Sequence, residues 1–260
     1  YKLKTYKASE AIQLKTGNCM SYAIVTAAIA ELAGIEYDFN EVQGSPVFQK
    51  EKGMLWVIGH VQTKLYDPNF VEQENTMYFS RPGVVIDYLP ELNSSVGARI
   101  GVKDFVSMYY SNIAAELIAE GEKEKAFYYA LKAHKENPSS VSNVNLLAVL
   151  HRQLGDVAVA ENLYVSAMKM NNKSISVLNN YRVLLERQQR QEDAELIQNK
   201  MEKLNDPNPY NWLEQAYLAL DRKEVKRAAR YFNNVIKRAP YLKEAYVGLY
   251  NIKLGEGDIE

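Results

Sequence analysis

Apolar residues recur with a helical period through the second half of the chain. Leu146, Leu147, Leu150 and Leu154 fall at spacings of three and four, which places them on one face of an α-helix. The same kind of pattern continues in successive segments from about residue 107 to residue 254. This half of the chain is therefore predicted to be all-α.

The helical segments repeat every 34 residues. Alanine marks the same place in four successive units: Ala126, Ala160, Ala194 and Ala228. A second row of small residues lies twelve positions upstream and is broken once: Ala114, Ala148, Arg182 and Ala216. Each unit closes at a residue where a helix is expected to end: Pro138, Asn172, Asp206 and Pro240. A fixed period of this length indicates a repeat architecture.

Stacked helical hairpins explain this pattern physically. A small residue in each helix lets two paired helices approach closely. Gly121 and Gly155 fall between the two helices of their units, where a left-handed C-cap is needed. One such hairpin cannot bury its own apolar face, so about three or more have to stack.

These features closely resemble the tetratricopeptide repeat family. The resemblance covers four units over about residues 107–242, and Lys243–Leu254 is expected to form a further, capping helix. We therefore predict that residues 107–260 form an all-α tetratricopeptide-repeat solenoid. The third unit departs from the pattern, with Arg182 in the small-residue row, Gln189 in place of the turn glycine, and Gln198 at a core position.

The resemblance implies peptide binding in the groove that the first helices line. Asparagines on these helices can pair with a peptide backbone, and arginines can meet a carboxylate: Asn112, Asn145, Asn179, Asn180, Arg152 and Arg187. The Lys-and-Asn set that grips a C-terminal carboxylate in some family members is absent, because other residues occupy the early groove positions: Met108, Ser142, Ser176 and Tyr210. The alternative is that these polar residues form only a solvated face.

Residues 1–106 do not repeat and are predicted to form an α+β domain. A helix over Cys19–Ala33 begins after the capping stretch 16–18 and stops at Gly34. It is apolar over much of its surface and is expected to pack against a sheet. Short β-rich runs predict the strands: Leu55–Ile58, Val61–Tyr66, Met77–Phe79 and Val84–Tyr88.

This first domain holds the candidate chemistry. Cys19 lies in the first turn of the helix, where free backbone N–H groups and the helix dipole favour a thiolate. His60 heads a predicted strand and Asp87 ends another, so a nucleophile, a base and an orienting carboxylate follow one another in sequence. Asp67 lies at the far end of the strand that His60 opens, so Asp87 is the better orienter. The alternative is an inert buried cysteine.

Gly17-Asn18-Cys19, the helix that ends at Gly34, the strand opened by His60, and Asp87 together resemble the transglutaminase-like branch of the papain-type superfamily. The resemblance covers about residues 8–92 and implies a helix packed on an antiparallel sheet. It also implies acyl transfer through Cys19, with Gln13 donating to the oxyanion. For Gln13, the alternative is an ordinary surface residue.

The sequence also departs from that family in three ways. Gln62 stands where an aromatic residue usually follows the histidine by two positions. Asp87 is not followed directly by proline, and the interval from His60 to Asp87 is long enough to require a hairpin or loop insertion.

Two classes of function follow. The first is a cysteine-dependent acyl transferase or amide hydrolase whose repeats recruit a protein or peptide. The second is a catalytically inactive transglutaminase-like scaffold that acts through protein binding by the repeats. We favour the first, because the cysteine, the histidine and an aspartate are all present in family order.

The composition of the chain excludes several other classes of protein and of site. The 260 residues carry a net charge of -1 and are 47% hydrophobic, which excludes a disordered chain and a general nucleic-acid binder. The single cysteine rules out an intrachain disulfide and a thiolate zinc cluster, and no cofactor, metal site or membrane span is expected. Because the chain starts at Tyr1 rather than Met, we favour an exported protein, periplasmic or membrane-anchored through a missing N-terminal segment, over a cytoplasmic one.

Overall fold

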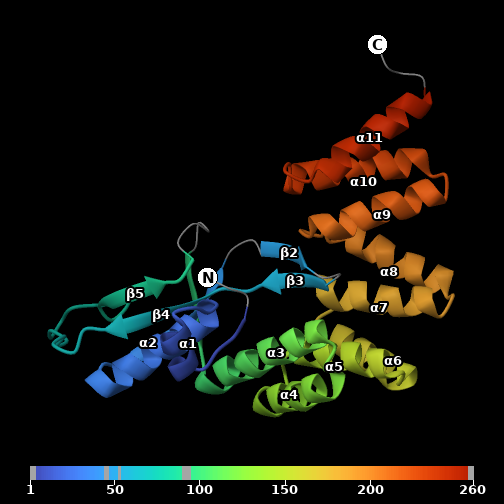
Figure 1. Ribbon diagram of the computed structural model, residues 1–260. Coiled ribbons are helices and arrows are strands. Elements are labelled where there is room, and N and C mark those ends of the chain that lie inside the picture. The colour runs from blue at the N-terminus through green and yellow to red at the C-terminus, as the bar shows by residue number, and fades with distance from the viewer. Residues whose placement is uncertain (1–3, 44–46, 52–53, 90–94, 257–260) are drawn as a thin grey trace. The chain divides into compact units, whose positions relative to one another are not determined.

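A computed structural model describes residues 4–43, 47–51, 54–89 and 95–256 (Figure 1). The chain divides into two units, residues 1–172 and residues 173–260.

The first unit contains a four-stranded antiparallel sheet. Its strands are β1 (Tyr37–Gln43), β4 (Val61–Tyr66), β5 (Gly83–Asp87) and β6 (Ser95–Ile100), and their order in the sheet is β5-β4-β1-β6. In the pairing of β4 with β5, Gln62 lies opposite Asp87. In the pairing of β1 with β4, Asn40 lies opposite Gln62. The middle of the sheet therefore carries polar side chains on one of its faces.

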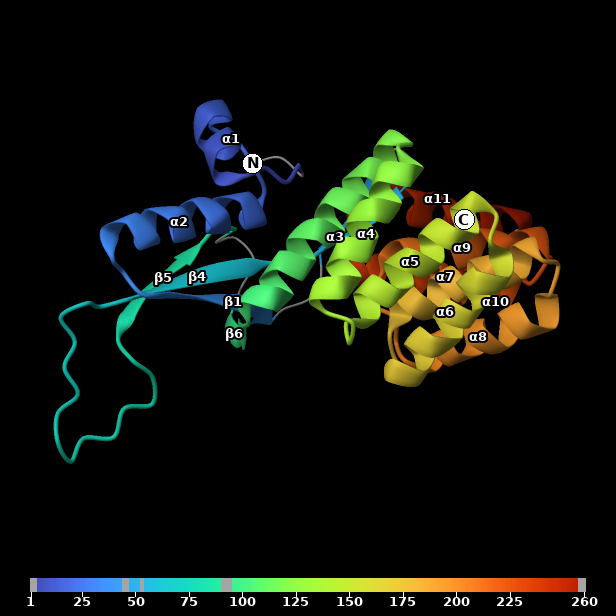
Figure 2. The same cartoon turned by 90° about the horizontal axis from the view of Figure 1, so that it is seen from below.

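Helix α2 (Cys19–Ala33) packs on the other face, as Figure 2 shows. The Asn18 side chain caps this helix by accepting a hydrogen bond from the Ser21 backbone N–H at 2.9 Å, and Gly34 ends it with a φ of 67°. The short helix α1 (Ala8–Leu14) precedes it. The predicted limits of α2, its cap and its packing against a sheet are confirmed.

An apolar core joins α2, the sheet and the first repeat helix. Met20, Ala23 and Val61 are buried in it, and the rings of Phe39 and Phe105 stack with centroids 3.7 Å apart. Phe105 belongs to α3 (Val102–Glu120), so the helical half begins at Val102 and its first helix shares a core with the sheet. The sheet and the first repeat helix therefore pack against each other within the first unit.

The strand predictions were partly wrong. Met77–Phe79 is not a strand: it lies in the long connection between β4 and β5, and Met77 and Phe79 are almost fully exposed. The sequence pattern did not reveal β1 or β6, which supply half of the sheet. A separate two-stranded hairpin is formed by β2 (Val47–Glu51) and β3 (Met54–Ile58).

Two helical hairpins complete the first unit. They are α3 with α4 (Lys123–Glu136), and α5 (Val141–Leu154) with α6 (Val157–Met170). The small-residue rows lie where these helices meet, since Ala114, Ala126, Ala148 and Ala160 have no exposed surface. Asn143 links the two hairpins, because its Nδ2 lies within 3.0 Å of Ser107 Oγ, Ala133 O and Asn137 O.

The second unit continues the same architecture. It contains α7 (Ile175–Arg187), α8 (Gln191–Lys203), α9 (Pro209–Asp221), α10 (Val225–Arg238) and the last described helix, α11 (Lys243–Glu256). Ala216 and Ala228 have no exposed surface where α9 meets α10. Gly248 of α11 lies against the Phe232 ring so closely that an added Cβ would come within 2.2 Å of it. The alternation of paired helices predicted from the 34-residue period is confirmed.

In every helical hairpin, the residue at the equivalent position of the turn has a left-handed backbone conformation. Gly121 and Gly155 have φ values of 84° and 95°, and Gln189 and Lys223 occupy the corresponding positions with φ values of 61° and 62°. A left-handed conformation is strained for any residue with a Cβ. The turn geometry is thus imposed by the packing of the helices, even where the sequence lacks glycine.

This strain yields a stability prediction. Gln189→Gly is expected to raise the free energy of unfolding by about 1 kcal/mol, because glycine adopts the left-handed conformation without a Cβ penalty. The neighbouring Gln188 has a φ of -84°, so Gln188→Gly is expected to destabilise or leave stability unchanged. Urea unfolding followed by circular dichroism measures both, and equal effects of the two changes would contradict the account.

Candidate functional site

The register of β4 and β5 brings two of the predicted catalytic residues together. Gln62 lies directly opposite Asp87, and His60 precedes Gln62 by two positions, so both side chains project from the same face of the sheet. His60 Nε2 lies 2.5 Å from Asp87 Oδ1. The connection from residue 67 to residue 82 supplies the loop that the long His60–Asp87 interval requires.

The Asp87 carboxylate is held at both oxygens. Oδ1 also accepts from the Leu89 backbone N–H at 2.9 Å, and Oδ2 accepts from Gln62 Nε2 at 2.6 Å. Gln62 is only 3% exposed. At the sequence level it stood out only as a departure from a family pattern, but the structure makes it the residue that orients Asp87. The signal that could have revealed it is the two-residue spacing from His60, which shares a strand face.

The contact with Asp87 favours one tautomer of the imidazole. An ionised carboxylate only accepts hydrogen bonds, so His60 Nε2 carries a proton toward Asp87. In the neutral ring the lone pair then lies on Nδ1, which is buried and has no hydrogen-bond partner. A base held in this way by a carboxylate is the arrangement that activates a thiol in cysteine-dependent acyl transfer.

Cys19 is placed at the start of α2 and is 6% exposed. Its Sγ lies 3.8 Å from the Gly59 carbonyl oxygen, one residue before His60. The turn before it is fixed, because Asn18 Nδ2 donates to Thr5 Oγ1 at 2.7 Å and the Tyr6 backbone N–H donates to Ser21 Oγ at 2.8 Å. The thiol is therefore held near the strand that carries His60.

The thiol and the imidazole nevertheless approach from different sides. Val61 belongs to the apolar core with Cys19, and Thr63 shares a hydrogen bond with Tyr88, which also bonds to Thr26 of α2. These residues face α2, whereas alternation along the strand turns His60 to the opposite face. The structure joins His60 to Asp87, and it shows no hydrogen bond from Cys19 to His60 Nδ1.

Gln13 and Tyr88 complete the set of residues considered with the thiol. Gln13, expected to donate to an oxyanion, is an exposed residue of α1, while Cys19 is buried. Tyr88 is mostly buried beside the helix, and this burial raises the pKa of its hydroxyl. Among the described residues, no group of three or more His, Cys, Asp or Glu is placed to hold a metal ion.

The predicted peptide-binding residues lie on first helices of the repeats. In the first unit, Asn112 lies on α3, and Asn145 and Arg152 lie on α5; all three are half-buried. In the second unit, Asn179 and Asn180 are half-buried on α7, and Arg187 is exposed at its C-terminal end. Whether these residues bind a peptide stays a prediction.

Comparison with known proteins supports the helical part. No protein-family model and no curated protein sequence matches the chain. Among solved structures, PilF of Pseudomonas aeruginosa is similar, with 21% identity and a TM-score of 0.52, over 61% of this chain and 72% of PilF. A tetratricopeptide-repeat protein of Thermus thermophilus shares 20% identity with a TM-score of 0.45, over 58% of this chain and 84% of that protein.

YrrB, described as a tetratricopeptide-repeat protein with an unusual peptide-binding site, shares 14% identity with a TM-score of 0.41, over 59% of this chain and 79% of YrrB. Of these three matches, PilF alone has a TM-score above 0.5, and at 21% identity it bears on the fold alone. The helical part of the chain has a tetratricopeptide-like solenoid fold, and a small antiparallel sheet lies at its N-terminal side. The comparisons do not show a transglutaminase-like or papain-type fold. No described helix has the length and apolar character needed to cross a membrane.

The hydrogen bonds of Asp87 lead to a prediction. Asp87→Ala removes its bonds to His60, Gln62 and the Leu89 backbone, and is expected to lower the free energy of unfolding by about 2–4 kcal/mol.

Asp67→Ala is the matched control. This exposed aspartate follows the far end of β4 and accepts from the Asn69 backbone N–H, so its loss is expected to cost less than about 1 kcal/mol. Urea unfolding measures both variants. A loss at Asp87 no larger than the loss at Asp67 would show that the His60–Asp87 pair does not stabilise the fold.

Proposed function

We propose that this protein binds a protein or peptide partner through the first-helix faces of its repeats. The observation that carries the proposal is the recurrence of half-buried asparagines on these helices, in a solenoid fold of the tetratricopeptide type. Asn145 and Asn179 occupy equivalent positions, 34 residues apart, on α5 and α7. A carboxamide offers both donors and an acceptor, so it can pair with the N–H and C=O groups of an extended peptide.

The neighbouring Asn143 has a structural role. Asn143 is 2% exposed and its amide is used inside the fold, where it links the first two hairpins. Asn145 lies two positions further along α5 and keeps part of its surface accessible. Because α-helical residues two apart point in different directions, one asparagine is structural while the other lies on the proposed binding face.

Arginines can add charge selectivity to this face. Arg187 is exposed at the end of α7, and Arg152 is half-buried at the end of α5. Acidic groups on a partner can form charge-assisted hydrogen bonds with guanidinium groups. The proposed partner is therefore a peptide segment with polar or acidic side chains.

The experiment selects peptides from a random displayed library against the full chain and measures their affinity. Asn145→Ala in the first unit and Asn179→Ala in the second are tested separately, and each is expected to weaken the peptides bound by its own unit by about fivefold, since a lost hydrogen bond costs about 1 kcal/mol.

Asn162→Ala on α6 is the matched control, because Asn162 is an exposed asparagine on a second helix. It is expected to leave affinity unchanged. If the Asn145 and Asn179 changes leave affinity unchanged, or if Asn162→Ala weakens binding equally, the first-helix face is not the binding surface.

A second candidate function is thiol-dependent acyl transfer in a transglutaminase-like domain. Its specific support is the buried His60–Asp87 pair, which leaves Nδ1 without a partner, together with Cys19 at a helix N-terminus. In this mechanism Cys19 Sγ attacks the carbonyl carbon of an amide, and its proton passes to His60. His60 then protonates the departing amine, and water or a second amine releases the acyl group from the sulfur.

This mechanism requires a movement. Sγ lies next to the Gly59 carbonyl, and it would have to turn toward Nδ1 for proton transfer. Cys19 and His60 are each 6% exposed, so a substrate would also have to open the site. These two requirements are the reason that partner binding is the leading proposal.

Alkylation tests the second candidate directly, because the chain has one cysteine. If Cys19 and His60 form a thiolate–imidazolium pair, iodoacetamide modifies the folded protein well below neutral pH, and His60→Ala lowers that rate by about tenfold or more.

His151→Ala in the second repeat is the control and is expected to leave the rate unchanged. The rate is followed by intact-mass spectrometry across pH. An unreactive Cys19, or a rate that does not depend on His60, would exclude acyl transfer and leave partner binding as it stands.

A further inference from the structure

Strand β5 lies at one edge of the four-stranded sheet (Figure 1). It pairs with β4 along one side, and none of the strands in the described part of the chain pairs with its other side. A strand in this position presents backbone N–H and C=O groups that can pair with another chain. Natural proteins usually protect such an edge with charges, proline or a covering segment, so an unprotected edge points to an interface.

The hydrogen bonds of β4 show which backbone groups of β5 point outward. The Tyr66 N–H donates at 2.9 Å to the carbonyl oxygen of Glu36, the residue before β1, so Tyr66 directs its backbone groups away from β5. This direction alternates along an antiparallel strand, so the next residue back, Leu65, bonds to β5, where its partner is Val84. The alternation continues in β5, and the N–H and C=O of Val85 therefore point to the open edge.

The side chains of β5 are also uncovered. Val84 is 65% exposed and Val85 is 37% exposed, and the two valines lie on opposite faces of the sheet. Met77 and Phe79, in the connection that leads into β5, are almost fully exposed as well. Exposed apolar surface of this kind marks interaction sites. The sequence of β5 contains no lysine, which is the residue that most often blocks pairing at an edge.

A second copy of β5 complements this edge. In an antiparallel pairing centred on Val85, the two Val85 residues lie opposite each other and exchange N–H···O hydrogen bonds. Gly83 then lies opposite Asp87 of the second copy, so the single charge of the strand meets no like charge. Cross-strand pairs of β-branched residues are stabilising, and a chain with a net charge of -1 repels its own copy only weakly.

We propose that two copies of this chain associate through β5, so that their four-stranded sheets join into one continuous sheet. The interface is small, because it consists of one short strand edge and two exposed valines from each copy. Association is therefore a reversible equilibrium with a Kd of about 1–100 μM. The residues proposed to bind a peptide lie outside β5, so this inference goes beyond the proposed function and is tested separately.

Sedimentation velocity of the full chain from about 1 to about 300 μM measures the association and is expected to show a monomer–dimer equilibrium. Hydrogen exchange followed by NMR at both ends of this range locates the interface. Exchange of the Val85 N–H is expected to slow by about threefold or more as the dimer forms, because this group is bonded only between the two copies. The Ile86 N–H points to β4 and is expected to exchange slowly at both concentrations.

Val85→Pro removes the outward N–H and leaves the bonds of the neighbouring residues to β4, since an edge strand tolerates proline at such a position. It is expected to weaken dimerisation by about tenfold or more. Val102→Pro is the matched control. Val102 is 70% exposed, begins α3 and follows Gly101, whose ψ of 153° suits the residue before a proline. This control is expected to leave the equilibrium unchanged.

Val85→Lys, with Val102→Lys as its control, repeats the comparison without a change to the backbone. Two lysines directly opposite each other repel, so Val85→Lys is expected to remain monomeric over the same range. Circular dichroism shows whether each variant is folded.

Three results would overturn the proposal. A monomer at every concentration would exclude the second copy and leave the edge to a strand from another protein. A dimer in which the Val85 N–H exchanges as fast as in the monomer would place the interface elsewhere. A dimer that folded Val85→Pro or Val85→Lys protein retains unchanged would do the same.

Discussion

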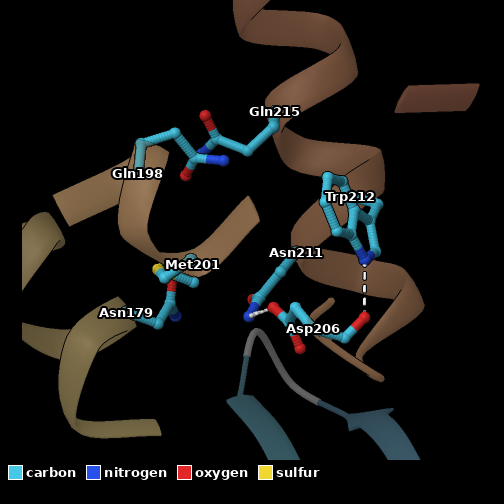
Figure 3. A pocket seen from close by; sticks show the side chains of 7 residues that line it. All are labelled: Asn179, Gln198, Met201, Asp206, Asn211, Trp212 and Gln215. Carbon is cyan, nitrogen blue, oxygen red and sulfur yellow. Dashed lines mark hydrogen bonds between the residues drawn. The ribbon is translucent and has the colours of Figure 1, made fainter. Parts of the chain in front are cut away.

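Close approach of paired helices is the constraint on which the structure depends. In the first, second and fourth repeats, the alanines where the two helices of a hairpin meet have no exposed surface. These alanines recur every 34 residues along the chain. The packing is strong enough to hold Gln189 and Lys223 in left-handed turns that glycine would adopt more easily. The third repeat differs, because Arg182 stands in the alanine row and a polar pocket lies between α7, α8 and α9 (Figure 3).

In the first hundred residues, the register of neighbouring strands determines which side chains meet. Because Gln62 lies opposite Asp87, the side chains of Gln62 and His60 reach one carboxylate from the same face of the sheet. The helix that carries Cys19 packs on the other face, through Val61 and Thr63. His60 and Asp87 are thus joined on one face of the sheet, while the thiol remains in the apolar core. The geometry suits a stabilising buried pair as it stands, and it suits catalysis only if the thiol turns.

The repeats were predictable because their signal is periodic and local. Ala126 and its equivalents fix the helix pairs before any contact is known, and the cap at Asn18 and the stop at Gly34 fix α2. The sheet was harder to predict. Strand β1 mixes charged and apolar residues without a long apolar run, whereas Met77–Phe79 resembles a strand locally but finds no neighbour to pair with among the described strands. The role of Gln62 depends on β4–β5 register, which spacing along the chain does not specify.

Hydrogen–deuterium exchange of the full chain, with and without a library-selected peptide, tests the central claim most directly. The account predicts that bound peptide slows exchange in α5 and α7, the helices that carry Asn145, Asn179 and Asn180. Slowed exchange confined to the start of α2 and to residues 59–66 and 83–89 would contradict it, because binding would then centre on Cys19, His60 and Asp87 rather than on the repeats.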